Sequence, residues 1–114
     1  MKPLRPLLLS LLLALSLPAV AADGFLADRH VKAGVACQSC HGPDLKNPVD
    51  PTLDDCTKCH SLKPLVEKTK DVKGHNPHTS PHYQDQLDCI NCHFGHAEGE
   101  NFCNQCHTFD FKVP

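Results

Sequence analysis

Apolar residues are concentrated near the start of the chain and are scattered thinly along the rest. Segment 7–17 is almost wholly apolar, and Pro6 and Pro18 bound it. Beyond it, single apolar residues stand among polar ones, and no stretch alternates with the period of two that predicts a strand. The pattern predicts a mostly irregular fold with a few short α-helices and no significant β-sheet.

One later segment, 64–73, favours a helix. Pro64 is tolerated in a first helical turn, and Gly74 is typical of a helix end. Its lysines form either a solvated surface or a local basic patch for an acidic partner or for the carboxylates of a bound group. The next segment, 74–83, contains two prolines and three histidines and predicts an irregular loop.

The first 22 residues have the order of a secretory signal peptide. Lys2 and Arg5 give a positive start, segment 7–17 is apolar, and the small residues of segment 19–22 suit a processing site. The apolar segment is well short of the roughly 20 residues that cross a bilayer. We therefore expect residues 1–22 to be removed, and the remainder to be exported to the periplasm.

The mature chain is then a single domain, residues 23–114. Loss of Lys2 and Arg5 leaves nine basic residues against 13 acidic residues, a net charge of −4 that gives no sign of a nucleic-acid partner. The domain contains no Trp, one Tyr and five Phe, which is little material for a core. Chains this small usually need a covalent or metal staple, and eight cysteines and nine histidines are available to supply it.

The cysteines fall into four Cys-x-x-Cys-His motifs, numbered here in chain order. Their cysteines are Cys37 and Cys40, Cys56 and Cys59, Cys89 and Cys92, and Cys103 and Cys106; their histidines are His41, His60, His93 and His107. Two intervening residues let both sulfurs reach the vinyl groups of one porphyrin, and the next histidine is placed under the iron. The spacing predicts four covalently attached haem c groups.

Paired cysteines have three other common uses. They are four disulfides, two four-thiolate zinc sites and a thiol redox centre. None of them explains why a histidine follows every pair directly, and export to the compartment where bacteria attach haem c agrees with haem.

Five histidines outside the motifs are candidates for the second axial position of each iron. They are His30, His75, His78, His82 and His96. The one methionine, Met1, belongs to the predicted signal peptide, so we expect bis-histidine irons of low potential. His96 lies three residues after His93 and should serve a different haem, the fourth being nearest in sequence. His75 and His78 should likewise reach two different haems.

The chain resembles the small tetrahaem cytochromes c of respiratory bacteria, and equally the tetrahaem domain that opens the flavocytochrome c fumarate reductases. The resemblance covers nearly all of residues 28–110 and rests on the four motifs, the early His30, the sequence His75-Asn76-Pro77-His78 and the step His93-Phe94-Gly95-His96. It implies short helices and loops wrapped around four packed haems, which replace an ordinary hydrophobic core.

The resemblance also implies a set of distal ligands. His75 would bind the first haem and His78 the second. His30 would bind the third haem and His96 the fourth. His82 would remain a free histidine near a propionate.

These features predict an electron-transfer protein rather than an enzyme. We expect a carrier of anaerobic respiration, monomeric or in a small complex, that takes electrons from a membrane quinol-oxidising cytochrome and passes them to terminal reductases. The alternative is the electron-donating haem subunit of a separately encoded, fumarate-reductase-like flavoprotein, since we expect no flavin domain in this chain. A multihaem reductase of small oxyanions would need an open iron position, and five spare histidines for four irons argue against one.

Overall fold

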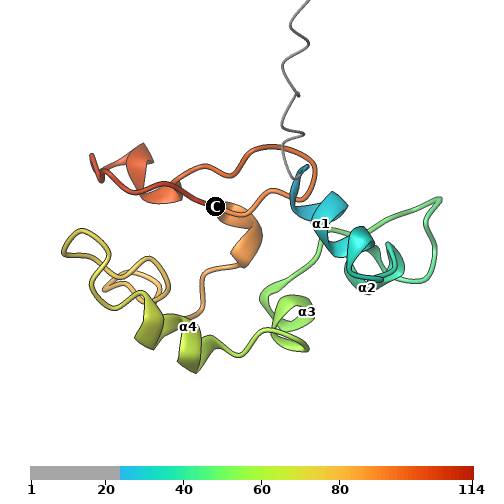
Figure 1. Cartoon of the computed structure of the whole chain (residues 1–114), viewed down its shortest axis with the longest axis horizontal. Helices are drawn as coiled ribbons and strands as arrows, with labels where there is room; N and C mark the ends of the chain where they lie inside the picture. Colours follow the sequence, from blue (N-terminus) through green and yellow to red (C-terminus); the bar gives the residue numbers. More distant parts are fainter. Residues whose placement is uncertain (1–23) are drawn as a thin grey trace, which may run out of the picture.

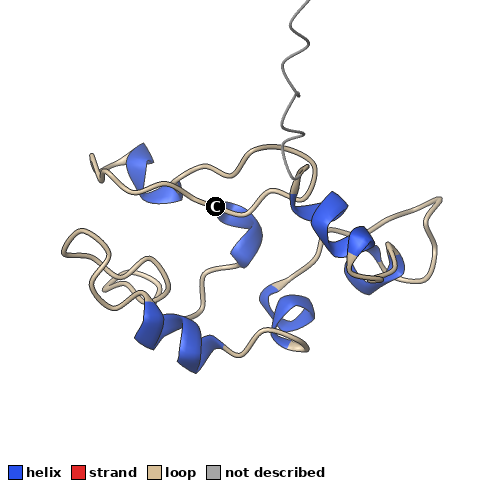
Figure 2. Cartoon of the chain, in the orientation of Figure 1, coloured by secondary structure: helices blue, strands red, loops and turns tan. Residues whose placement is uncertain are grey.

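The computed structural model describes residues 24–114 (Figure 1). The predicted signal peptide, residues 1–22, lies outside this part. The described chain forms short helices joined by long loops (Figure 2). In chain order they are α1 (Leu26–Lys32), α2 (Gln38–His41), α3 (Leu53–Thr57), α4 (Leu62–Lys68), and the 3₁₀ helices η1 (Cys89–Asn91) and η2 (Phe102–Gln105). Residues 24–114 contain no β-strand, only two isolated bridges, so the expected fold class is confirmed.

Each Cys-x-x-Cys-His motif folds as one helical turn. In all four motifs, the backbone N–H of the histidine donates to the carbonyl of the first cysteine at 2.8 to 3.0 Å. The N–H of the second cysteine donates to the same carbonyl at 3.1 to 3.2 Å. The turns coincide with α2, the end of α3, η1 and η2. The motif is therefore a repeated local structure that presents two cysteines and one histidine from a single turn.

The helix predicted at 64–73 is found at Leu62–Lys68 instead. It begins earlier because Ser61 is extended, and Pro64 then occupies the first turn, where a missing N–H costs no hydrogen bond. It ends earlier because the Thr69 hydroxyl donates to the Leu65 carbonyl at 2.7 Å, and the backbone there leaves the helical region.

No side chain of the described residues is fully buried, whether apolar or polar. Several large apolar side chains are well exposed, among them Phe25, Val31 and Val49. Helices this short cannot bury an apolar face against one another, so the polypeptide does not form a core of its own. None of the helices formed by residues 24–114 has the length and hydrophobicity that a membrane crossing requires.

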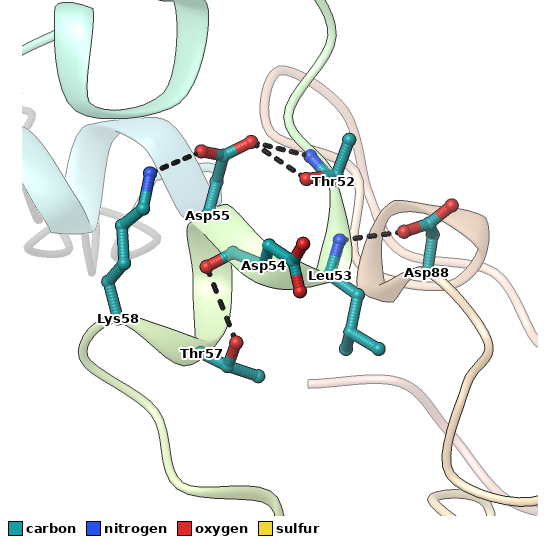
Figure 3. A network of polar contacts seen from close by, with 7 residues as sticks. All are labelled: Thr52, Leu53, Asp54, Asp55, Thr57, Lys58 and Asp88. Atoms are coloured by element: carbon teal, nitrogen blue, oxygen red, sulfur yellow. Dashed lines mark hydrogen bonds and ion pairs between the residues drawn. The ribbon is translucent and has the colours of Figure 1, made fainter.

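A polar network at the start of α3 joins the second motif to the third (Figure 3). The carboxylate of Asp88, which directly precedes the third motif, accepts the backbone N–H of Leu53 at 2.6 Å. Asp55 accepts from the backbone N–H and the hydroxyl of Thr52, both at 2.9 Å, and pairs with Lys58 at 2.7 Å. Helix α3 also contacts α2 on one side and η1 on the other.

Candidate haem sites

Every motif histidine lies beside one histidine from outside the motifs. The ring centroids are separated by 5.8 Å for His41 and His96, 6.0 Å for His60 and His30, 6.3 Å for His93 and His78, and 6.1 Å for His107 and His82. Four of the five candidate histidines are therefore each placed against a different motif.

The separation within these pairs fits two imidazoles that share one iron. Two metal–nitrogen bonds of about 2 Å, with about 1 Å more from each nitrogen to its ring centre, place the centroids roughly 6 Å apart. Direct ring packing is closer, as in the 4.0 Å between His75 and Phe109. The residues present therefore fit a bis-histidine haem at each of the four motifs.

Hydrogen bonds hold several of these rings by the Nδ1 atom. An imidazole anchored at Nδ1 leaves Nε2 for a metal, and such outer contacts fix the ring orientation and raise the basicity of the ligand. The contacts join Nδ1 of His30 to the Leu26 carbonyl at 2.8 Å, Nδ1 of His41 to the Val49 carbonyl at 2.9 Å, and Nδ1 of His78 to the Thr69 hydroxyl at 2.8 Å.

The surroundings of two paired histidines favour the neutral ring. Burial lowers the pKa of His78, and burial, followed by the electrostatic interaction with His78, lowers the pKa of His93. Neutral imidazole is the form that binds a metal.

The thiols show that the motifs are neighbours in chain order. Burial raises the pKa of Cys40, with a further contribution from Cys56. Burial, then the nearby Cys89, raises the pKa of Cys56 to about 11. Burial raises the pKa of Cys92, which also lies near Cys103. None of the eight cysteines, all of which lie among the described residues, forms a disulfide. A raised thiol pKa disfavours the thiolate that zinc requires, whereas a thioether carries no charge to desolvate.

A cavity of about 560 Å³ opens beside His93. Phe25 and Phe94 contribute apolar surface to its lining, and Arg29 and Lys112 contribute positive charge. Apolar walls with basic side chains suit a porphyrin face and its propionates. A second cavity of about 360 Å³ lies beside Cys40 and Cys59, between the first two motifs.

The pairs differ from those implied by the resemblance, first for His96 and His30. His96 lies against His41 rather than against the fourth motif, and His30 lies against His60 rather than against the third. The reason is a long-range contact: the N–H of Ala27 donates to the Gly95 carbonyl at 2.8 Å. This bond brings the residue next to His96 onto α1, which leads into the first motif.

The other differences lie in the loop 75–82. His78 lies against His93 rather than the second motif, and His82, expected to be free, lies against His107. His75, expected to bind the first haem, packs on Phe109. A tight turn closed by two hydrogen bonds between Ser80 and Gln84 carries His82.

The turn residues before His82 are the sequence signal that could have identified it as a candidate ligand. Ser80 and Pro81 precede it directly, and a serine followed by proline favours a turn. No nearby residue in the sequence indicates that His75 lies apart from the motif histidines, because its aromatic neighbour, Phe109, is far along the chain.

Known proteins match the chain over most of its length. A family model described as cytochrome c3 matches residues 29–108. The chain is 38% identical over 81 residues to the acrylate reductase cytochrome subunit of Shewanella woodyi, with 68% of each protein covered. It is 35% identical over 96 residues to the probable fumarate reductase Ifc3 of Shewanella frigidimarina. This match covers 82% of this chain but 16% of that protein. The chain thus belongs to the cytochrome c3 family and is an electron-transfer protein with covalently bound haem c.

Proposed function

We propose that this cytochrome carries four haem c groups, each attached through the two cysteines of one motif and held between two imidazoles. The motif histidine is one ligand of each iron. The second ligands of the first, second, third and fourth motifs are, in that order, His96, His30, His78 and His82. The observation that supports this assignment is the separation of 5.8 to 6.3 Å in all four histidine pairs. His82 thus replaces His75 in the set of four distal ligands.

The proposed role is to pass electrons along the row of motifs. Bound haem supplies each position with an iron that gains and loses one electron. The polypeptide fixes the imidazoles and holds successive motifs together through the contacts of α3 with α2 and η1 and through the proximity of Cys92 to Cys103. Because both axial positions of every iron would be filled, the chain offers no open metal position to a substrate.

The proposed acceptor is a separately encoded flavoprotein reductase, and the proposed donor is a membrane quinol-oxidising cytochrome in the periplasm. The acceptor is suggested by the two relatives, whose names are those of a reductase's cytochrome subunit and of a probable fumarate reductase. The second candidate is a free carrier of anaerobic respiration that passes electrons to several reductases. The predicted signal peptide supports a periplasmic location for both candidates.

Purification of the native holoprotein under mild conditions tests this assignment. We expect an intact mass of the mature polypeptide plus four haems, co-purification with a flavoprotein, and oxidation of the reduced cytochrome by that flavoprotein in the presence of its substrate. An isolated monomer oxidised equally well by unrelated reductases would support the free carrier instead. A mass equal to that of the amino acids alone would refute both roles.

A further inference from the structure

The hydroxyl of Thr69, the residue that follows α4, has three polar neighbours. It lies 2.7 Å from the Leu65 carbonyl, 3.0 Å from the side-chain oxygen of Asn76 and 2.8 Å from Nδ1 of His78. The Asn76 amide is oriented by two further bonds. Its Nδ2 donates to the Val66 carbonyl at 2.8 Å, and its Oδ1 accepts the backbone N–H of His78 at 3.0 Å.

This arrangement determines where the protons lie. A hydroxyl has one hydrogen to donate, and the Leu65 carbonyl and the Asn76 Oδ1 can only accept. Whether the Leu65 carbonyl or the Asn76 Oδ1 accepts the hydroxyl hydrogen, the Thr69 oxygen has no hydrogen left for the imidazole. It must therefore accept a hydrogen bond from Nδ1 of His78. The His78 ring therefore carries its proton on Nδ1 and has its lone pair on Nε2.

We propose that Thr69 is a positioning residue for the third haem, which fixes the tautomer and the rotation of its distal ligand His78. This inference rests on the proposed ligation by His78. The planes of the His78 and His93 rings are nearly parallel, at 2°, so the rotation of the distal ring matches that of the proximal one. A hydrogen bond from Nδ1 increases electron donation through Nε2, which favours ferric iron and lowers the reduction potential of that haem.

The test compares two substitutions in the holoprotein. Thr69→Val keeps the shape and removes the oxygen, whereas Thr69→Ser keeps the oxygen. Potentiometric titration followed by EPR should show one of the four midpoint potentials shifted upward in the valine variant, together with a changed signal from a haem with near-parallel imidazoles. The serine variant should match the wild type. Unchanged potentials, an equal shift of all four, or a serine variant that behaves like valine would overturn the proposal.

Thr57→Val is the matched control. The hydroxyl of Thr57 donates to the Asp54 carbonyl at 3.3 Å, and no hydrogen bond joins it to a histidine of the described residues. The variant should leave the potential of the third haem unchanged. The wild type supplies an independent measurement. In reduced protein with ¹⁵N-labelled histidine, NMR should detect a slowly exchanging Nδ1 proton on His78, and its absence would overturn the proposal without any variant. The haem content distinguishes failure of this proposal from failure of the proposed function. Fewer than four haems per wild-type chain would refute the proposed function itself.

Discussion

His75 and His82 lie in one loop but have different neighbours. The ring of His82 lies 6.1 Å from that of His107, whereas the ring of His75 packs on Phe109 at 4.0 Å. Phe109 in turn stacks on His107 at 4.8 Å with an angle of 6° between the rings. Among the ring pairs of the described residues, His75 is the one candidate histidine that lies beside no motif histidine. The two histidines should therefore respond differently to substitution.

His82→Ala should open one axial position of the fourth haem. The oxidised variant is expected to show a high-spin signal in EPR and absorption for one haem in four, while His75→Ala should keep four low-spin haems. A high-spin haem in the His75 variant, with none in the His82 variant, would reverse the assignment.

The rotation of the paired imidazoles differs from site to site. The angle between the rings is 76° for His30 and His60 but 2° for His78 and His93. In low-spin ferric iron, crossed imidazoles give a strongly anisotropic EPR signal and parallel ones give a rhombic signal. We expect one strongly anisotropic species, which His30→Ala removes. Four rhombic species in the wild type would contradict the geometry.

The residues of the motifs could be predicted from the sequence because their chemistry is local: two cysteines and a histidine on one helical turn. The partners of the motif histidines could not. Their pairing depends on contacts between distant segments, such as the Ala27–Gly95 bond and the packing of Phe109 on His75. Proximity along the chain, which favoured His96 for the fourth haem, does not represent those contacts.

At the scale of elements, the start of α3 depends on carboxylates. Asp88 accepts the N–H of Leu53, which is one of the helix donors without a partner inside the helix. Asp88→Ala should lower the free energy of unfolding of the holoprotein by about 1 kcal/mol, the usual cost of losing such a cap. Chemical denaturation measures it, with Asp88→Asn, which keeps an acceptor, as the control. An alanine variant as stable as the asparagine variant would contradict this role.

Asp55 makes the same helix sensitive to acid. Hydrogen bonds from Lys58 and then from Thr52 lower the pKa of Asp55 to about 2. Because the folded pKa lies below the unfolded value of about 3.9, the carboxylate stabilises the fold above that value, and its contribution is lost as the pH falls toward 2. Acid titration of the holoprotein should show a loss of stability in this window, and the loss should be smaller in Asp55→Asn. Equal pH profiles would contradict it.

The bounds of α4 show the limit of reading elements from sequence. Pro64 and Gly74 are valid helix signals, but the segment after Lys68 is held by the bonds of Thr69 to Leu65 and of Asn76 to Val66. The side chains that end the helix are thus also those that hold the loop with His78.

At the scale of the whole molecule, none of the residues 24–114 is fully buried, and their apolar side chains form no core. A chain without a core of its own cannot offset the conformational entropy of folding. Polypeptide made without haem attachment should therefore lack helical circular dichroism and be cleaved rapidly by protease, whereas the holoprotein should resist. A protease-resistant, helical haem-free chain would contradict this expectation.

The pairing of His41 with His96 has a consequence for the order of assembly. These residues are 55 positions apart, against 15 for His78 and His93. Closing a loop costs about 0.6 kcal/mol more for each doubling of its length. A first iron held by its proposed pair would therefore crosslink the chain at an entropic cost about 1 kcal/mol greater than the third. In the proposed export from the N-terminus, the second motif would have its partner as soon as His60 emerges, and the third as soon as His93 does. The first motif would therefore emerge before the others but would be the third to have both of its histidine ligands.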